Sequence, residues 1–333
     1  KTMGFDLEQK PLRTWSHLAK NRRKPSEYDI VSKNLHYSMN NPDAPWEQSP
    51  GSPMNMWYKK YRNATPLKHQ DWDVFSDPDK LVYRTYNLLQ DGQENHVQSL
   101  FGQFNEREHD KMLEADWVST LAQMYTPLRY VFHALQMSST YVMQMAPSST
   151  ISNCATFQAA DFLRRVTHTS YRTYELSMTY PDAGFGTAER DIWEKAGQFQ
   201  PMRELVEKQL VSYDWSEAVV SLCFVVLPML SEGVLKPLSE ASHQGNDTLM
   251  PMLIDSQLHD ARRHARWATE FYQVLAAGND GNEGVTQKII DKWVPLADAA
   301  IQAYIAAIPN SAVTATQAIA AAAKKRRDMT EAA

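Results

Sequence analysis

The chain has 333 residues, 43% of them hydrophobic, which is enough to bury one large core or two ordinary ones. Its net charge of −5 is too mild to indicate a nucleic-acid partner. Cys154 and Cys223 have no second thiol or histidine at zinc spacing, so we expect buried, reduced thiols. The most apolar stretch, 218–230, has 13 residues, which suits a core helix and is too short for a membrane span. We expect no signal peptide and a cytoplasmic protein with no membrane partner.

Residues 1–76 differ in composition from the rest of the chain. They hold 7 of the 17 prolines and 4 of the 9 tryptophans. Pro42 and Pro45 would break a long helix, yet the segment is too rich in aromatic residues for a disordered one. We therefore predict an extended arm that lies either on the chain's own bundle or on another subunit, and the aromatic density favours another subunit. The candidates for subunit contact are Trp15, Trp46, Trp57, Tyr58 and Trp72.

Helices are expected from residue 77 onward, because glycine is scarce and Leu, Ala, Met, Gln and Glu recur. Asp77 and Pro78 look like a helix N-cap followed by proline at the first helical position, and Thr126 and Pro127 repeat this pattern. Apolar periodicity predicts that further long helices cover about 126–146, 153–179, 214–243 and 248–277. No stretch has the pattern of a series of strands, so the predicted fold class is all-α.

Two runs that start 99 residues apart indicate the chemistry. Residues 161–165 are Asp-Phe-Leu-Arg-Arg, and residues 260–264 are Asp-Ala-Arg-Arg-His. Each is similar to a D-E-x-R-H motif, and Glu-x-x-His on two helices of a bundle is how carboxylate-bridged di-iron proteins hold their metals. Phe162 and Arg165 stand at the Glu and His positions of the first run. Ala261 stands at the Glu position of the second, where His264 alone is kept.

This pattern predicts a ferritin-like (ribonucleotide-reductase-like) helical bundle with extra helices, whose metal site has lost its ligands. The bundle is predicted at 77–278, after the arm at 1–76, with further C-terminal helices at 279–333. A chain with this frame but without its ligands is expected to be the non-catalytic partner of a chain that has them.

Two intact Glu-x-x-His strings leave an alternative open. Glu106 precedes His109 in a run of charged and polar residues, and Glu240 precedes His243 at a predicted helix end. We interpret both strings as surface features, because neither has the flanking Asp and Arg of the motif. The alternative is a free-standing di-iron oxidase or a metal-binding ferritin-like protein that uses these strings.

Longer stretches resemble one family. They are residues 13–19, 24–32, 79–94, 104–110, 152–156, 167–169 and 180–184. Through them the chain resembles the beta-type, non-catalytic hydroxylase subunits of bacterial multicomponent soluble di-iron monooxygenases, the toluene, toluene-o-xylene, alkene and isoprene monooxygenases. The resemblance extends to about residue 305.

The resemblance implies a scaffold subunit in an NADH-dependent enzyme that hydroxylates aromatics or epoxidises alkenes with O2. Its partners would be an alpha subunit with the di-iron centre and a gamma subunit, in a dimer of three-chain protomers. An effector protein, a Rieske-type ferredoxin and an NADH reductase would complete the system. This chain itself would have no catalytic residue, cofactor or metal. The hydrocarbon, the regiospecificity and any contact with effector or ferredoxin stay open.

The ligand frame of the catalytic alpha subunits can be placed on this sequence by similarity. Where the family has Glu, Glu, His, Glu, Glu and His, this chain has Phe132, Phe162, Arg165, Leu227, Ala261 and His264. One imidazole cannot hold two irons without carboxylates.

The polar residues of the two runs also carry expectations. Because Asp260 lies four residues before His264, we expect it to accept a hydrogen bond from that imidazole. We expect an ion network in place of iron, built from Arg164, Arg165, Arg262 and Arg263 with Asp161 and Asp260. Phe132 and Phe162 would fill the remaining volume.

Overall fold

The computed structural model describes residues 25–33, 35 and 51–331, and within this part every regular element is helical and no strand occurs. The predicted all-α fold is therefore confirmed. The α-helices are α1 (Glu27–Ser32), α3 (Pro53–Tyr58), α4 (Tyr83–Glu106), α5 (Ala115–Thr120), α6 (Leu128–Met145), α7 (Ser149–Thr179), α8 (Glu189–Lys195), α9 (Gln200–Leu210), α10 (Trp215–Ser221), α11 (Lys236–Ser242), α12 (Leu249–Gly278), α13 (Asn282–Ala306) and α14 (Ala315–Thr330). Shorter 3-10 and π segments are η3 (Lys59–Asn63), η4 (Trp72–Val74), η5 (His109–Met112), η6 (Leu121–Tyr125), η7 (Gly197–Phe199), η8 (Leu222–Val226), η9 (Met229–Leu235) and η10 (His243–Gly245).

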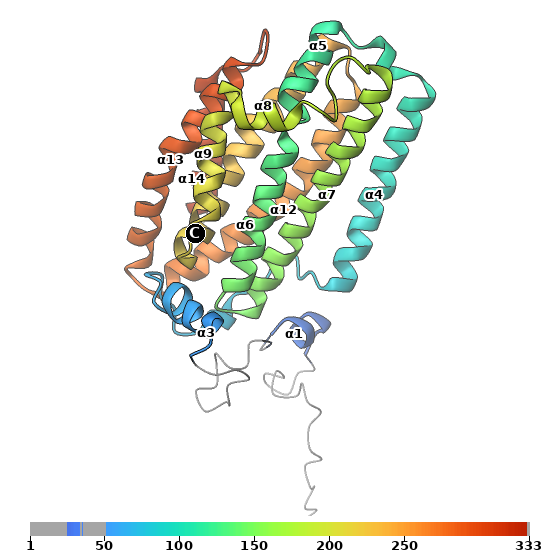
Figure 1. Cartoon of the computed structure of the whole chain (residues 1–333). Coiled ribbons are helices and arrows are strands. Elements are labelled where there is room, and N and C mark those ends of the chain that lie inside the picture. Colours follow the sequence, from blue (N-terminus) through green and yellow to red (C-terminus); the bar gives the residue numbers. More distant parts are fainter. Residues whose placement is uncertain (1–24, 34, 36–50, 332–333) are drawn as a thin grey trace, which may run out of the picture.

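Long helices run side by side along one axis of the molecule, with α4, α6, α7 and α12 in one group and α9, α13 and α14 beside them (Figure 1). The core helix, Trp215–Gly245, joins α10, η8, η9, α11 and η10 into 31 continuous residues. By length and composition it could cross a membrane, but 94% of its most apolar window is buried inside the bundle. The expectation that this apolar stretch is too short for a membrane span is thus wrong about length. The expectation of a core helix is confirmed by this burial.

The predicted helix start at Asp77 is wrong. The Asp77 carboxylate accepts hydrogen bonds from the backbone N–H groups of Asp79 and Leu81, both at 3.0 Å, and Lys80 adopts a left-handed φ of 51°. The chain turns here, and α4 begins only at Tyr83. A buried Tyr28 hydroxyl accepts from the Asp77 backbone N–H at 2.8 Å, so a contact distant in sequence stabilises the turn.

The next two helices also start at residues other than the predicted ones. Thr126 and Pro127 follow α5 and η6 without a break in helical backbone, so they join helices rather than start one. The helix predicted from residue 153 begins at Ser149. Ser148 is its N-cap, and the Ser148 hydroxyl accepts from the Thr150 backbone N–H at 3.3 Å.

The described part of the predicted arm lies on the chain's own bundle and is partly helical, so it is not extended throughout. The Trp57 indole N–H donates to the Tyr141 hydroxyl of α6 at 3.0 Å. Trp72 packs on Trp215 and Phe271, with ring centroids 5.4 and 6.1 Å apart. Tyr58 also packs against the core, whereas Trp15 and Trp46 lie outside the described residues. Contact of any of these five with another subunit stays a prediction.

The C-terminal helices pack against the core helix. Tyr304 of α13 is fully buried and donates to the Met124 carbonyl at 3.0 Å. Gly233 of η9 faces Ile301 of α13 so closely that an added Cβ would overlap the isoleucine side chain. The Lys325 ammonium of α14 donates to the Ser231 hydroxyl at 2.8 Å. The contacts of Gly233 and Ser231 place α13 and α14 against the core helix, and the Tyr304 hydrogen bond joins α13 to η6. The division at residue 278 stays a prediction.

Candidate functional site

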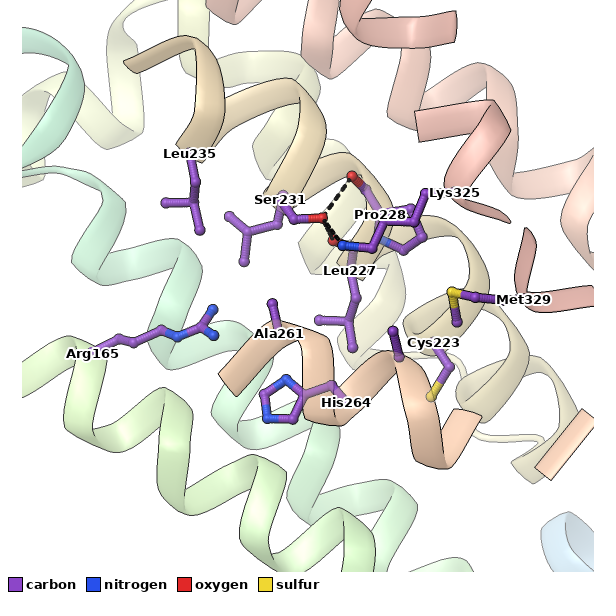
Figure 2. A pocket seen from close by; sticks show the side chains of 12 residues that line it. Arg165, Cys223, Leu227, Pro228, Ser231, Leu235, Ala261, His264, Lys325 and Met329 are labelled. Carbon is purple, nitrogen blue, oxygen red and sulfur yellow. Dashed lines mark hydrogen bonds between the residues drawn. The ribbon is translucent and has the colours of Figure 1, made fainter. Parts of the chain in front are cut away.

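Four of the six frame positions meet at one small cavity. Arg165 comes from α7, Leu227 from the core helix, and Ala261 and His264 from α12 (Figure 2). Phe162 flanks the cavity, since the Arg165 guanidinium lies 4.7 Å from its ring and the His264 ring lies 5.7 Å away, centroid to centroid. The structure therefore brings five of the positions together. Leu227 lies between the π segments η8 and η9, where the helix is locally widened.

Phe132 is the exception among the six. It is fully buried on α6, as a volume-filling residue would be, but it does not line the cavity.

The residues at the six positions do not fit a di-iron centre. The cavity volume is about 10 Å³, which is room for about one water molecule. None of its 12 lining residues is a carboxylate, and two of them, Arg165 and Lys325, are cations. Iron in such bundles is neutralised and bridged by carboxylates. In the described residues no group of three His, Cys, Asp or Glu side chains could hold a metal.

Asp161 lies beside the cavity at the centre of a buried polar network. Its carboxylate is fully buried and accepts from the Tyr86 hydroxyl at 2.8 Å, from the Gln90 amide at 2.7 Å and from His264 Nε2 at 2.7 Å. It also pairs with Arg263. Burial alone would raise the pKa of Asp161, but the hydrogen bond from His264 and the charge of Arg263 outweigh it and lower the pKa to about 2.

Asp260 is the second acid of the network. It accepts from Gln90 at 3.0 Å and pairs with Arg164 at 3.1 Å and with Arg263 at 3.3 Å. The predicted hydrogen bond from His264 to Asp260 is wrong, because the imidazole points to Asp161 on the neighbouring helix. Burial lowers the pKa of His264, although its hydrogen bond to Asp161 opposes this effect.

Two predicted members of the ion network lie outside it. The Arg165 guanidinium donates to the Gln257 carbonyl at 2.7 Å and pairs with neither acid. Arg262 is exposed and lies 3.7 Å from Asp255. An arginine in the motif frame can thus lie inside or outside the network, depending on the helix face that presents it.

Sequence reasoning missed the contribution of α4. Tyr86 and Gln90 bind Asp161, and Glu94 pairs with Arg164 at 2.6 Å and with His168 at 2.9 Å. The three α4 residues are spaced four apart, so they lie on one helix face. The available signal in the sequence was the recurrence of hydrogen-bonding side chains every four residues, at 86, 90 and 94.

Neither intact Glu-x-x-His string belongs to a group of three possible metal ligands in the described residues. Glu106 is exposed at the last residue of α4, while His109 follows a break in the helix. His109 is buried and lies 3.2 Å from the Asp247 carboxylate, so its interpretation as part of a solvated face is wrong. Glu240 and His243 are both exposed.

A family model described as Methane/Phenol/Alkene Hydroxylase matches residues 57–279. The chain belongs to the methane/phenol/alkene hydroxylase family. This confirms the family resemblance predicted from the sequence, and the matched range contains all six frame positions.

Relatives of this hydroxylase family match the chain over most of its length. It is 61% identical over 313 residues to the hydroxylase component subunit beta of the toluene-4-monooxygenase system of Ectopseudomonas mendocina, covering 94% of this chain and 95% of the relative. A solved toluene 4-monooxygenase chain, from a structure with toluene bound in the resting active site, matches with a TM-score of 0.86 and 62% identity over 90% of this chain and 98% of that one. Phenol hydroxylase from Pseudomonas sp. OX1 matches with a TM-score of 0.81 at 20% identity, covering 97% and 94%, which shows the shared fold alone.

Proposed function

We propose that this chain is the non-catalytic beta subunit of the hydroxylase of a multicomponent di-iron monooxygenase, and that a separate alpha subunit holds the iron. The observation that supports this most is the composition of the six frame positions. Five offer no metal ligand, and the cavity between them is lined by two cations and no carboxylate. A cavity lined by cations repels positively charged iron ions, which a di-iron monooxygenase requires.

The assembly would have the composition that the family resemblance implies. Similarity to a subunit beta over 94% of the chain supports an alpha and a gamma partner, in a dimer of three-chain protomers. An effector protein, a Rieske-type ferredoxin and an NADH reductase would supply control and electrons. Since the relative at 61% identity belongs to a toluene-4-monooxygenase system, we propose an aromatic hydrocarbon as the substrate class and the cytoplasm as the location.

The contribution of this chain would be a rigid frame. The buried acids Asp161 and Asp260 each have several hydrogen-bonding or ion-pair partners, from α4, α7 and α12. Such a network fixes the relative position of helices more than it adds net stability. The surface of the frame would then meet the alpha subunit, with Trp15 and Trp46 of the arm as the remaining contact candidates outside the described residues.

Co-purification tests this assembly. The tagged full-length chain, expressed with its candidate alpha and gamma chains, should recover both of them. A Trp15→Ala/Trp46→Ala variant should recover at least tenfold less alpha chain, because aromatic anchors contribute a large share of interface energy.

The matched control is the Trp15→Phe/Trp46→Phe variant, which keeps most of the aromatic surface and should recover nearly the wild-type amount. Recovery of the tagged chain alone, carrying its own iron, would contradict the proposed function. Normal recovery by the alanine variant would contradict only the contact assigned to the arm.

A further inference from the structure

Arg165 is a buried cation with no carboxylate partner in the described part of the chain. Its side chain is 2% exposed, and its guanidinium reaches into the cavity toward Ala261 and His264 (Figure 2). One Nη donates to the Gln257 carbonyl at 2.7 Å, and the face of the guanidinium lies over the Phe162 ring. The Nε atom is buried and has no hydrogen-bond partner. A buried charge left in this state is costly.

The neighbouring acids Asp260 and Asp161 act on the charge of Arg165 from a distance but form no ion pair with it. Asp161 is engaged by Arg263 and His264, and Asp260 by Arg164 and Arg263. Both acids therefore have partners of their own, and neither lines the cavity.

A second cation adds to the positive field. Lys325 of α14 lines the same cavity and lies 3.3 Å from the Glu232 carboxylate. Glu232 also forms an ion pair with Lys236, so this one carboxylate pairs with two ammonium groups. Arg165 and Lys325 thus bring two positive charges to the cavity lining, and Glu232 is not part of that lining. The rest of its lining is mainly apolar, including Leu227, Leu230 and Leu235.

We propose that this cavity binds one small monovalent anion, a halide such as chloride, against the Arg165 guanidinium. A volume of about 10 Å³ admits a particle near the size of one water molecule and excludes phosphate or an organic carboxylate. A water molecule would satisfy the free N–H but would leave the charge unbalanced, whereas a halide does both. The apolar lining suits an ion that is more weakly hydrated than a carboxylate. This inference does not depend on the proposed function.

Bromide, which scatters anomalously, is the probe that tests the site. Crystals of the full-length protein in its purified assembly are grown or soaked in sodium bromide. We expect an anomalous peak in contact with the Arg165 guanidinium in the wild type and in Arg262→Met, an exposed arginine on the neighbouring helix. We expect no peak in Arg165→Met. A cavity without an anomalous peak in the wild type, or a peak that persists in Arg165→Met, overturns the proposal.

A solution measurement separates a site from general salt effects. Tm is measured as bromide replaces gluconate at constant ionic strength. A single site predicts a rise in Tm that follows a saturating curve in the wild type and in Arg262→Met. A rise that does not saturate, or no rise at all, overturns the proposal even if crystals show bromide, because binding would then occur at crystal concentration only. If Arg165→Met fails to fold, the wild-type crystal and the wild-type titration still decide the question.

Discussion

At the scale of single residues, Asp161 is the acid on which the network depends. It binds side chains from α4 and α12, and it is the partner of the one imidazole kept from the ligand frame. The sequence could predict that Asp161, Asp260 and His264 are interior, because they lie in the two motif runs. It could not predict the pairing of His264 with Asp161, since a four-residue spacing within a helix suggests Asp260 and the register between α7 and α12 is set only by packing.

Replacing Asp161 with Asn should destabilise the protein by about 3–5 kcal/mol, because Arg263 would lose one of its two carboxylate partners and would share Asp260 with Arg164, which leaves an excess of buried positive charge. Denaturant unfolding followed by tryptophan fluorescence measures this change. The matched control is Asp255→Asn, whose carboxylate is 74% exposed and pairs only loosely with Arg262; it should change stability by less than about 0.5 kcal/mol. Equal effects of the two variants would show that the network is not a structural unit.

His264 should give the protein a distinct pH dependence. Its folded-state pKa lies below the ordinary value of 6.5, so the folded protein binds this proton less readily than the unfolded chain does. The stability that neutral His264 contributes is therefore complete above about pH 6.5 and is lost as the pH falls through the lower folded pKa.

The His264→Gln variant keeps a donor for Asp161 but cannot titrate. Its free energy of unfolding should fall less than that of the wild type between about pH 7 and pH 5. Exposed His243→Gln is the control and should keep the wild-type slope. Parallel curves for wild type and His264→Gln would refute the assigned protonation state.

At the scale of elements, periodicity predicted the long helices better than their ends. Asp77 and Pro78 have the composition of a helix start, but Asx-type hydrogen bonds and the distant Tyr28 hydroxyl hold a turn there instead. The helix predicted at about 214–243 is present as the continuous core helix of 31 residues, which includes the π segments η8 and η9. The described arm residues pack on the bundle. Trp72 contacts the aromatic rings of Trp215 and Phe271, which lie about 140 and 200 positions later in the chain.

The close approach of the core helix to α13 depends on a glycine. Gly233→Ala should destabilise the protein by about 1–3 kcal/mol, because the new methyl group would overlap Ile301. Gly92→Ala in the middle of α4 is the matched control. Nothing lies within 4 Å of a Cβ built there, so the helix should gain about 0.5–1 kcal/mol. Thermal unfolding of both variants measures the difference, and a neutral or stabilising Gly233→Ala would show that the two helices can separate at little cost.

At the scale of the whole molecule, the sequence allowed the family to be recognised, because long specific strings extend over most of the chain. The match of the family model to residues 57–279 confirms that recognition. The composition of a subunit interface could not be predicted in the same way. Trp57 and Trp72 are candidates for subunit contact by their aromatic character; both pack on this chain's own bundle, and their contact with another chain stays a prediction.

Iron content per separated subunit tests the central claim most directly. The purified assembly is dissociated, its chains are separated under conditions that retain bound metal, and each is analysed for iron by elemental mass spectrometry. The account predicts that iron follows the alpha chain and that this chain carries far less than one iron per molecule. Stoichiometric iron in this chain, lost in Glu106→Ala or Glu240→Ala, would contradict the account and favour a free-standing di-iron protein.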